Sequence, residues 1–336
     1  MSIGNINSLP WYARFSIFAA MALTVYAGFW YFVTSGTRKD TRKLVDQIKV
    51  LQKANTEAQI ASQRLIEFKA SYKSKQEQLE ELKTFIQRQD IVSLPGSSEV
   101  QVAPTPRFYR WTFASMWTPG PFETRPLRAY YYITDAEPAW PAERQEEHLR
   151  DFNFGALWAI SIHEVYPGHF LHYQHLRQVS ATLRKSILFS STAMVEGWAH
   201  YCEQMMVEAG FRKQDPDIRR GQLAEALIRL CRLIVGIRLH CEDLSVEQGV
   251  RFFRDEAYME EASARREAER GTFDPAYVLY SLGKLMVLKL RDDYKALKGD
   301  TYSARAFHDT LLGNGTVPLW LQRNLMLGEN NGSMLE

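Results

Sequence analysis

Residues 155–162 are Gly-Ala-Leu-Trp-Ala-Ile-Ser-Ile, and residues 163–169 continue with His-Glu-Val-Tyr-Pro-Gly-His. The apolar part predicts a buried helix, and the part that follows places a His-Glu pair at its end. A zinc motif on one helix normally has two histidines four residues apart, with a glutamate beside the first. Here the spacing is six, so His169 would lie roughly 120° away from the face of His163 on an ideal helix.

Pro167 and Gly168 offer a remedy for this spacing. Proline lacks an N–H, and its ring would clash with the carbonyl of His163, while glycine tolerates unusual backbone dihedrals. The helix is therefore expected to distort here. A bulge that absorbs about two residues would return His169 to a position equivalent to four residues after His163.

A third ligand is found in residues 195–203, Val-Glu-Gly-Trp-Ala-His-Tyr-Cys-Glu. Glu196, His200 and Glu203 share one helical face by their i, i+4 and i+7 spacing. We expect Glu196 to complete a metal site with His163 and His169, because three protein ligands and one open position define a catalytic zinc site.

The other polar residues of the two motifs are predicted to act on the water or to hold the ligands in place. Glu164 is expected to act as the general base on a metal-activated water. His200 and Glu203 are expected to hydrogen-bond to the ligands from behind. One Zn²⁺ is predicted only from the nitrogen and oxygen ligand types, which several divalent metals accept.

Two other interpretations of these histidines stay open. His169, His172 and His175 are spaced three apart and could form a surface metal cluster without catalysis. Alternatively, His163 could be an ordinary core histidine, with Glu196 in an ion pair on its helix.

Four separated motifs resemble the DUF885 family, a domain of unknown function similar to gluzincin metallopeptidases. They are HEVYPGHFLH (163–172), EGWAHYCE (196–203), TFDPAYVLYSLGKL (272–285) and DTLLGNGTVPLWL (309–321). The resemblance covers about residues 82–327. It implies that His163, His169 and Glu196 are the metal ligands, that Glu164 is the general base, and that Tyr280 donates to an oxyanion.

The resemblance also implies an α-helical, zincin-like domain over residues 91–336. Family members usually carry a long helical region ahead of the site, and in this chain a different N-terminal region replaces it. The chain could be a natural fusion of two families or a chimera, and the missing region could supply one wall of a substrate cleft.

The N-terminal region contains one long apolar stretch. Phe15–Val33 carries no charge, and about 20 apolar residues are needed to cross the hydrocarbon core of a bilayer. Aromatic residues flank the stretch, as is typical at membrane interfaces. Residues 1–34 are therefore predicted to be a transmembrane anchor, with a cleaved signal peptide as the alternative.

Residues 35–90 are predicted to form a coiled-coil stalk that pairs with another protein or with a second copy. The alternative is an amphipathic helix that lies on its own domain. The heptad pattern, broken only at Lys75, consists of Leu51, Ala54, Ala58, Ala61, Leu65, Phe68, Tyr72, Leu79, Leu82 and Ile86.

The polar start, the span and the basic coiled coil of about residues 1–85 resemble PilO, a type IV pilus assembly protein family of the bacterial inner membrane. This resemblance implies a single-pass protein with a periplasmic C-terminal domain. The charge pattern argues for the opposite orientation, since four basic residues between 38 and 43 follow the span and only Arg14 precedes it.

The rest of the chain reads as mainly helical. Pro and Gly residues between 91 and 108 predict an irregular connector, and Arg128–Thr134, which is rich in tyrosine, predicts a short strand. The expected helices are Glu143–Gly168, Thr182–Ala209, Asp217–Glu242, Val246–Arg270, Val278–Lys298 and Ser303–Leu312.

The overall composition excludes some classes of function. The 336 residues contain 41 Lys and Arg against 39 Asp and Glu, a balance that gives no reason to expect a nucleic-acid partner. The leading hypothesis is a membrane-anchored zinc hydrolase of peptide bonds. The alternative is a non-catalytic pilus-type scaffold with a vestigial metal site; hydrolysis of another amide or an ester would use the same chemistry.

Overall fold

A computed structural model describes residues 6–96, 98–125, 128–329 and 333–334; the side chains of residues 6, 57, 58 and 60–71 lie outside this description. The described chain is mainly helical with one small sheet, as expected. It divides into two units, an N-terminal unit, Met1–Ser71, and a compact unit, Tyr72–Glu336.

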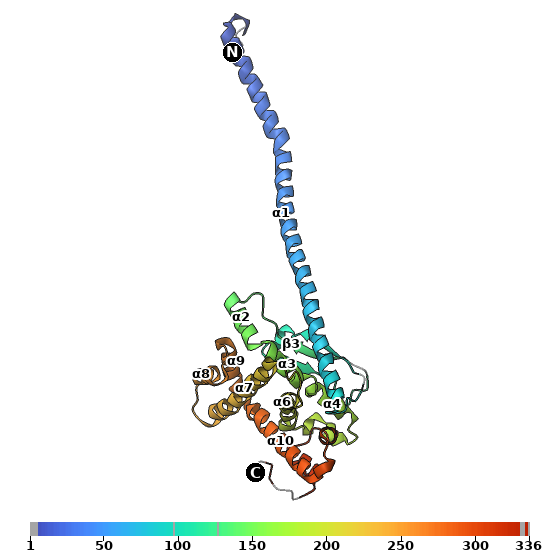
Figure 1. The fold of residues 1–336 in the computed structure, drawn as a ribbon. Helices are drawn as coiled ribbons and strands as arrows, with labels where there is room; N and C mark the ends of the chain where they lie inside the picture. Colours follow the sequence, from blue (N-terminus) through green and yellow to red (C-terminus); the bar gives the residue numbers. More distant parts are fainter. Residues whose placement is uncertain (1–5, 97, 126–127, 330–332, 335–336) are drawn as a thin grey trace. The chain divides into compact units, whose positions relative to one another are not determined.

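The helices and strands follow one another in the order shown by colour in Figure 1. The helices are α1 (Trp11–Arg88), α2 (Ala142–Asp151), α3 (Phe154–Glu164), α4 (His169–Gln178), α5 (Thr182–Lys185), α6 (Thr192–Glu208), α7 (Pro216–Cys241), α8 (Val246–Ala257), α9 (Glu261–Gly271), α10 (Val278–Lys298), α11 (Ala304–Gly313) and α12 (Leu319–Leu327). The strands are β1 (Val100–Pro104), β2 (Ala114–Trp117) and β3 (Ala129–Ile133).

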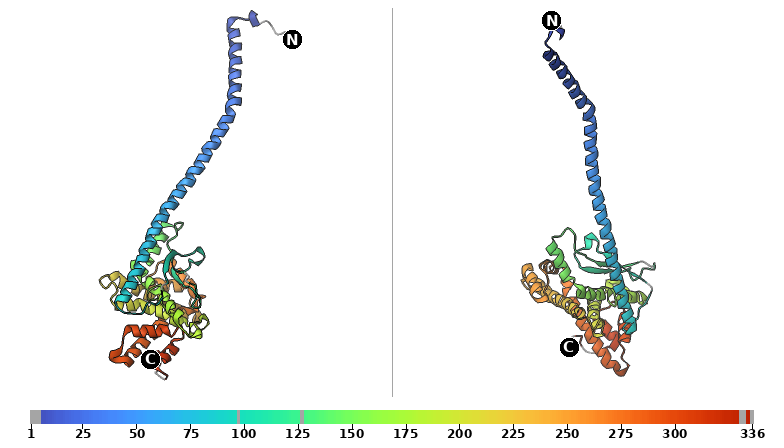
Figure 2. Two further views of the ribbon diagram at one scale, coloured as in Figure 1. Left: turned by 90° about the vertical axis from the view of Figure 1, so that its right-hand side faces the viewer. Right: turned by 45° about the horizontal axis from the view of Figure 1, so that its top comes forward.

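In the compact unit, α6 packs on α3, α7 and α10, and α7 packs on α3 and α10. Figure 2 gives two further views of the ribbon. Helices α8 and α9 pack beside α7 around a buried apolar cluster that includes Phe253 and Tyr277. Gly197 of α6 and Gly283 of α10 face each other and let the two helices come close together. A Cβ added to Gly283 would lie 2.1 Å from the carbonyl oxygen of Ala193. This close approach fixes the helix that carries Glu196.

The three strands form one sheet in the order β1-β3-β2, with β1 parallel and β2 antiparallel to β3. Strand β3 confirms the expected strand at residues 128–134, and its Ala129, Tyr131 and Ile133 are buried. The Tyr131 hydroxyl lies 3.1 Å from the Ser161 hydroxyl of α3, so the sheet is tied to the central helices. Strand β2 occupies one edge of the sheet.

Three of the expected helices were wrong in extent, because each is interrupted. Glu143–Gly168 becomes α2, α3 and a turn, since Asn153 caps a new helix by accepting from the N–H of Ala156. Val246–Arg270 becomes α8 and α9, separated after Tyr258, which has a left-handed backbone (φ +57°). Thr182–Ala209 becomes α5, a 3-10 turn and α6, whose N-cap is Ser191. Strands β1 and β2 and helix α12 were not anticipated.

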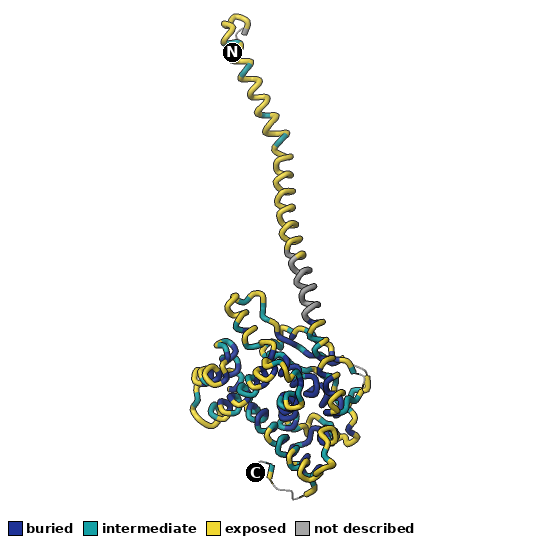
Figure 3. The backbone as a smooth tube through the Cα atoms, in the orientation of Figure 1, coloured by how far each residue is buried: buried dark blue, intermediate teal, exposed yellow. Residues whose placement is uncertain are grey.

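The apolar N-terminal helix is present. Among the described residues, one helix, within Trp11–Thr56, is long and apolar enough to cross a membrane by length and composition. Its apolar side chains are solvent-exposed, for example 69% at Phe15 and 80% at Phe32. Figure 3 shows this part of α1 in yellow and the buried residues gathered in the compact unit.

The heptad pattern of α1 divides into three parts. Tyr72, Leu79, Leu82 and Ile86 are buried within the compact unit, so for these four residues the structure shows an amphipathic helix on its own domain. Ala58, Ala61, Leu65 and Phe68 lie outside the described side chains. Leu51 and Ala54 are exposed, and pairing of this segment with a partner stays a prediction, as does the division into residues 1–34, 35–90 and 91–336.

Candidate metal centre

The first histidine of the motif lies near the end of a buried helix. Helix α3 is apolar from Phe154 to Ile162, and most of its residues are buried, including Trp158 and His163. The helix ends at Glu164, directly after His163. Consequently one side chain, His163, is held firmly inside the core, while Glu164 is half-buried at the edge of a cavity.

A tight turn, rather than a bulge in one continuous helix, brings His169 next to His163. Residues 165–168 separate α3 from α4, which begins at His169. A Cβ on Gly168 would lie 1.7 Å from the carbonyl oxygen of His163, so only glycine fits there. The Gly168 N–H donates to the Ile162 carbonyl at 3.0 Å. The imidazole rings of His163 and His169 then lie with centroids 4.8 Å apart.

Glu196 reaches both histidines from α6. Its Oε2 lies 3.4 Å from His163 Nε2 and 3.5 Å from His169 Nε2. One ligand atom from each of the three residues lies within 4.8 Å of the others. Two ligands of a tetrahedral zinc ion, each at about 2.1 Å, stand about 3.4 Å apart. The nitrogen and oxygen donors of this set therefore fit a single divalent cation.

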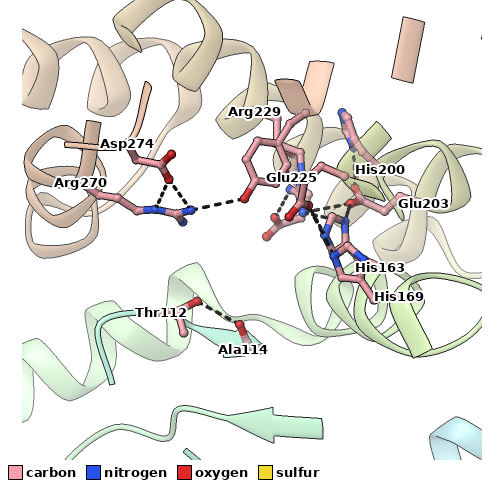
Figure 4. A network of polar contacts seen from close by, with 12 residues as sticks. Thr112, Ala114, His163, His169, His200, Glu203, Glu225, Arg229, Arg270 and Asp274 are labelled. Atoms are coloured by element: carbon pink, nitrogen blue, oxygen red, sulfur yellow. Dashed lines mark hydrogen bonds and ion pairs between the residues drawn. The ribbon is translucent and has the colours of Figure 1, made fainter. Parts of the chain in front are cut away.

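The far side of His163 is held by a carboxylate. Glu203 Oε1 accepts from His163 Nδ1 at 2.7 Å (Figure 4). This leaves His163 Nε2 facing Glu196 Oε2, 3.4 Å away. His200 Nδ1 lies 3.2 Å from Glu203 Oε2. His200 and Glu203 thus lie behind His163 rather than beside the cavity, and their role as supports of a metal ligand stays a prediction.

A salt-bridge network that the motifs did not reveal extends from Glu203. Arg229 Nη2 lies 2.9 Å from Glu203 Oε1, and Arg229 Nη1 lies 2.5 Å from Glu225 Oε2. Burial by itself raises the pKa of Glu203, but the charges of Arg229 and His200 and the hydrogen bonds of His163 and His200 hold it well below its usual range. Glu225 and Arg229 are four residues apart within an apolar stretch of α7, and this spacing is the signal that could have revealed them.

The protonation of His163 depends on the same partners. Burial lowers the pKa of His163, whereas hydrogen bonds to Glu196 and Glu203 raise it to about 9. A cation at Nε2 would therefore compete with a proton for this position. His169 Nδ1 is buried and has no hydrogen-bond partner among the described residues.

The surface histidine cluster is not what the structure shows, because His172 and His175 are buried. His175 Nε2 lies 3.0 Å from the Ser93 carbonyl oxygen. The three candidate ligands instead open onto a cavity of about 300 Å³. Strand β2 and aromatic side chains line it together with Glu164, Tyr280 and three arginines, Arg229, Arg232 and Arg270.

Tyr280 lies in this cavity, on α10. Its hydroxyl lies 3.4 Å from Arg270 Nη2. Burial raises the pKa of Tyr280, and the negative charge of Glu196 raises it further, so the phenol keeps its proton at neutral pH.

Comparisons with known proteins agree with the motif-based resemblance. A family model described as "Bacterial protein of unknown function (DUF885)" matches residues 35–326, a match that begins well before residue 82. A solved structure described as a "putative lipoprotein of unknown function", from Shewanella oneidensis, is similar at 30% identity with a TM-score of 0.67. The match covers 76% of this chain and 45% of that protein.

A second solved structure, described as a "putative lipoprotein" from Colwellia psychrerythraea, is similar at 25% identity with a TM-score of 0.63. The match covers 75% of this chain and 42% of that protein. The chain thus spans less than half the length of both solved proteins. No curated protein matches it. The resemblance of residues 1–85 to PilO stays a prediction.

Proposed function

Because the chain belongs to the bacterial DUF885 family of unknown function, we propose its activity from the geometry of the site: a membrane-anchored, zinc-dependent hydrolase of peptide bonds. The observation that carries the proposal is the convergence of His163, His169 and Glu196, whose donor atoms lie within 4.8 Å of one another at the wall of a cavity. Glu164 opens onto the same cavity.

His163 and His169, through nitrogen, and Glu196, through oxygen, would hold the ion. When bound, zinc would lower the pKa of a water molecule to about 7 and polarise a carbonyl group. Glu203 keeps His163 oriented, because its Oε1 accepts the proton of Nδ1.

Glu164 is the proposed general base. It accepts a proton from the attacking water and donates it to the departing amine, so peptide bond and water become an acid and an amine. Tyr280 is the proposed oxyanion donor, since its protonated hydroxyl lies in the same cavity and can donate to the oxygen on which negative charge develops.

The proposed location is the bacterial inner membrane, with one span and a periplasmic C-terminal domain. The exposed apolar surface of α1 supports a membrane anchor, and the similar solved proteins are described as lipoproteins. The periplasmic orientation rests on the PilO resemblance, whereas the charge pattern argues for the opposite orientation. A reporter fused to the C-terminus tests it: a cytoplasmic signal would refute the periplasmic orientation.

The proposed partners are a peptide substrate and, through α1, a coiled-coil protein or a second copy. A non-catalytic pilus-type scaffold is the alternative function. The deciding experiment uses the full chain in detergent, because Leu79 and Leu82 of α1 belong to the core of the compact unit.

The measurement is zinc content, followed by cleavage of a mixed peptide library. We expect about one zinc per chain, which Glu196→Ala should lose. Glu208→Ala is the control and should keep the zinc, because Glu208 is exposed on the same helix. We expect cleavage that Glu164→Gln abolishes without loss of zinc. A zinc-free, inert protein would favour the scaffold.

A further inference from the structure

The cavity has a second charged region besides the candidate ligands. Figure 4 shows Arg270 and Asp274 well apart from His163 and His169. Arg270 nevertheless lines the same cavity as both histidines, together with Trp111 and Thr112. One cavity therefore contains a candidate metal centre and, away from it, a guanidinium group.

The other two arginines of the cavity form ion pairs with buried glutamates. Arg232 donates through Nε and Nη2 to the two carboxylate oxygens of Glu267, at 2.6 and 2.7 Å. Arg229 uses Nη1 and Nη2 on Glu225 and Glu203. The side chains of Arg229 and Arg232 are only 6% and 11% exposed. A ligand that drew either one away from its glutamate would break a buried ion pair, which is costly.

Arg270 differs because it is more exposed and because its ion pair uses a single carboxylate oxygen. Nε and Nη2 both donate to Asp274 Oδ2, at 3.0 and 2.8 Å. Nη1 has no hydrogen-bond partner among the described residues. The side chain is 19% exposed, which leaves it accessible from the cavity. Its guanidinium carbon also lies 5.4 Å from the ring centroid of Trp111 and 5.2 Å from that of Tyr277.

These contacts hold the guanidinium in place before any ligand arrives. A charged group fixed by an ion pair and by aromatic rings loses little conformational freedom on binding. Nη2 also donates weakly to the Tyr280 hydroxyl oxygen, at 3.4 Å. A planar guanidinium held in this way suits a carboxylate, which accepts several hydrogen bonds.

We propose that Arg270 binds a carboxylate of the substrate at the end of the cavity away from the metal ligands. This inference rests on the proposed function and names its substrate class: peptides that carry a carboxylate near the bond to be cut. The carboxylate can be the C-terminus of the peptide or an acidic side chain.

The test is peptide binding by isothermal titration calorimetry. The protein is the zinc-loaded full chain with Glu164→Gln, so that no peptide is consumed. The probes are acetyl-Ala-Ala-Phe with a free carboxylate, the same peptide as its C-terminal amide, and acetyl-Ala-Asp-Phe amide. We expect one carboxylate-bearing probe to bind about 10- to 100-fold more tightly than the uncharged amide, as charge-assisted hydrogen bonds predict.

Arg270→Ala should remove this preference, and Arg265→Ala should keep it. Arg265 is a matched control, because it lies on the same helix α9 and pairs with Glu247 and Glu261 outside the cavity. Tighter binding of the free acid identifies the C-terminus as the source; tighter binding of the Asp peptide identifies the side chain.

Equal binding of all three probes, no binding of any probe, or a preference that survives Arg270→Ala would overturn the proposal. Should Arg270→Ala fail to fold, Arg270→Lys gives the same reading: it keeps the charge but not the planar fork, and the preference should fall at least about threefold. Cleavage by the wild-type chain is measured separately, so carboxylate binding without cleavage would refute only the hydrolase.

Discussion

His163 and His308 are both buried in the compact unit, but their surroundings differ in kind. His308, on α11, has protein partners on both nitrogens: Nδ1 lies 2.8 Å from the Ile91 carbonyl oxygen, and Nε2 lies 2.8 Å from the Tyr201 hydroxyl. His163 has a carboxylate at Nδ1, while Nε2 faces Glu196 across 3.4 Å.

This difference shows that burial alone does not identify a metal ligand. A histidine whose two nitrogens are both used by neutral groups of the protein has no lone pair left for a cation. A histidine fixed by a carboxylate at one nitrogen presents the other, which is the usual arrangement behind a zinc ligand. Substitutions in the two regions test this contrast, beginning with the largest expected effect.

Replacement of each histidine should separate the two regions most sharply. His163→Gln should weaken zinc affinity more than 100-fold, beyond the 10–100-fold typical of a partner behind a ligand. His308→Gln should leave zinc affinity within about twofold, because no ligand changes. Competition with a fluorescent zinc chelator measures both, and equal loss in the two variants would remove the distinction.

Loss of the carboxylate behind His163 should have the next largest effect. Glu203→Ala leaves Arg229 with one fewer partner in the core, so we expect a loss of stability of about 3–5 kcal/mol and of zinc affinity of 10–100-fold. Thermal unfolding should show a midpoint lower by roughly 6–15 °C. A variant with unchanged zinc affinity would show that Glu203 does not orient the ligand.

An extra methyl group between α6 and α10 should have a smaller effect on stability. In Gly283→Ala the new methyl would lie 2.1 Å from the Ala193 carbonyl oxygen, so we expect about 1–3 kcal/mol of destabilisation. Gly313→Ala is the control, since nothing lies within 4 Å of its added Cβ. Chemical denaturation measures both, and equal stability of the two variants would contradict the close contact.

The pH dependence of stability should show the smallest effect, at His308. Burial lowers the pKa of His308 to about 4, below its ordinary value of 6.5. The unfolded chain therefore binds the proton more readily, and the stability contribution is present above pH 6.5 and is lost as the pH falls toward 4. His308→Gln should make the fall of the thermal midpoint between pH 6.5 and 4 shallower without removing it, since burial also lowers the pKa of His200 to about 4. An unchanged slope would assign the dependence to other groups.

The sequence predicted the candidate ligands but not how the chain brings them together. His163, Glu164, His169 and Glu196 stand in recognisable local motifs, and the Pro-Gly pair indicated a distortion. The pattern could not show that α3 ends and α4 begins, because the path of the turn depends on the close contact between Gly168 and the carbonyl of His163. The strand at residues 129–133 was visible from its tyrosines, whereas β1 and β2 were hidden in a stretch rich in Pro and Gly.

The supporting residues depended on tertiary packing. Arg229 lies on α7, outside the motifs, and Arg270 lies at the end of α9, just before the motif at residues 272–285; contacts between helices bring both to the cavity. Residues 72–86 fitted a coiled coil equally well, because a heptad pattern describes one apolar face and does not say which surface covers it.

The central claim is that His163, His169 and Glu196 hold one divalent ion. Zinc K-edge X-ray absorption of the full chain, loaded with one equivalent and dialysed, tests it most directly. The account predicts two imidazole nitrogens and carboxylate or water oxygen at about 2.0–2.2 Å, with zinc lost in Glu196→Ala. Zinc that is removed by dialysis of the wild-type chain, or that is retained with an unchanged spectrum in Glu196→Ala, would contradict it.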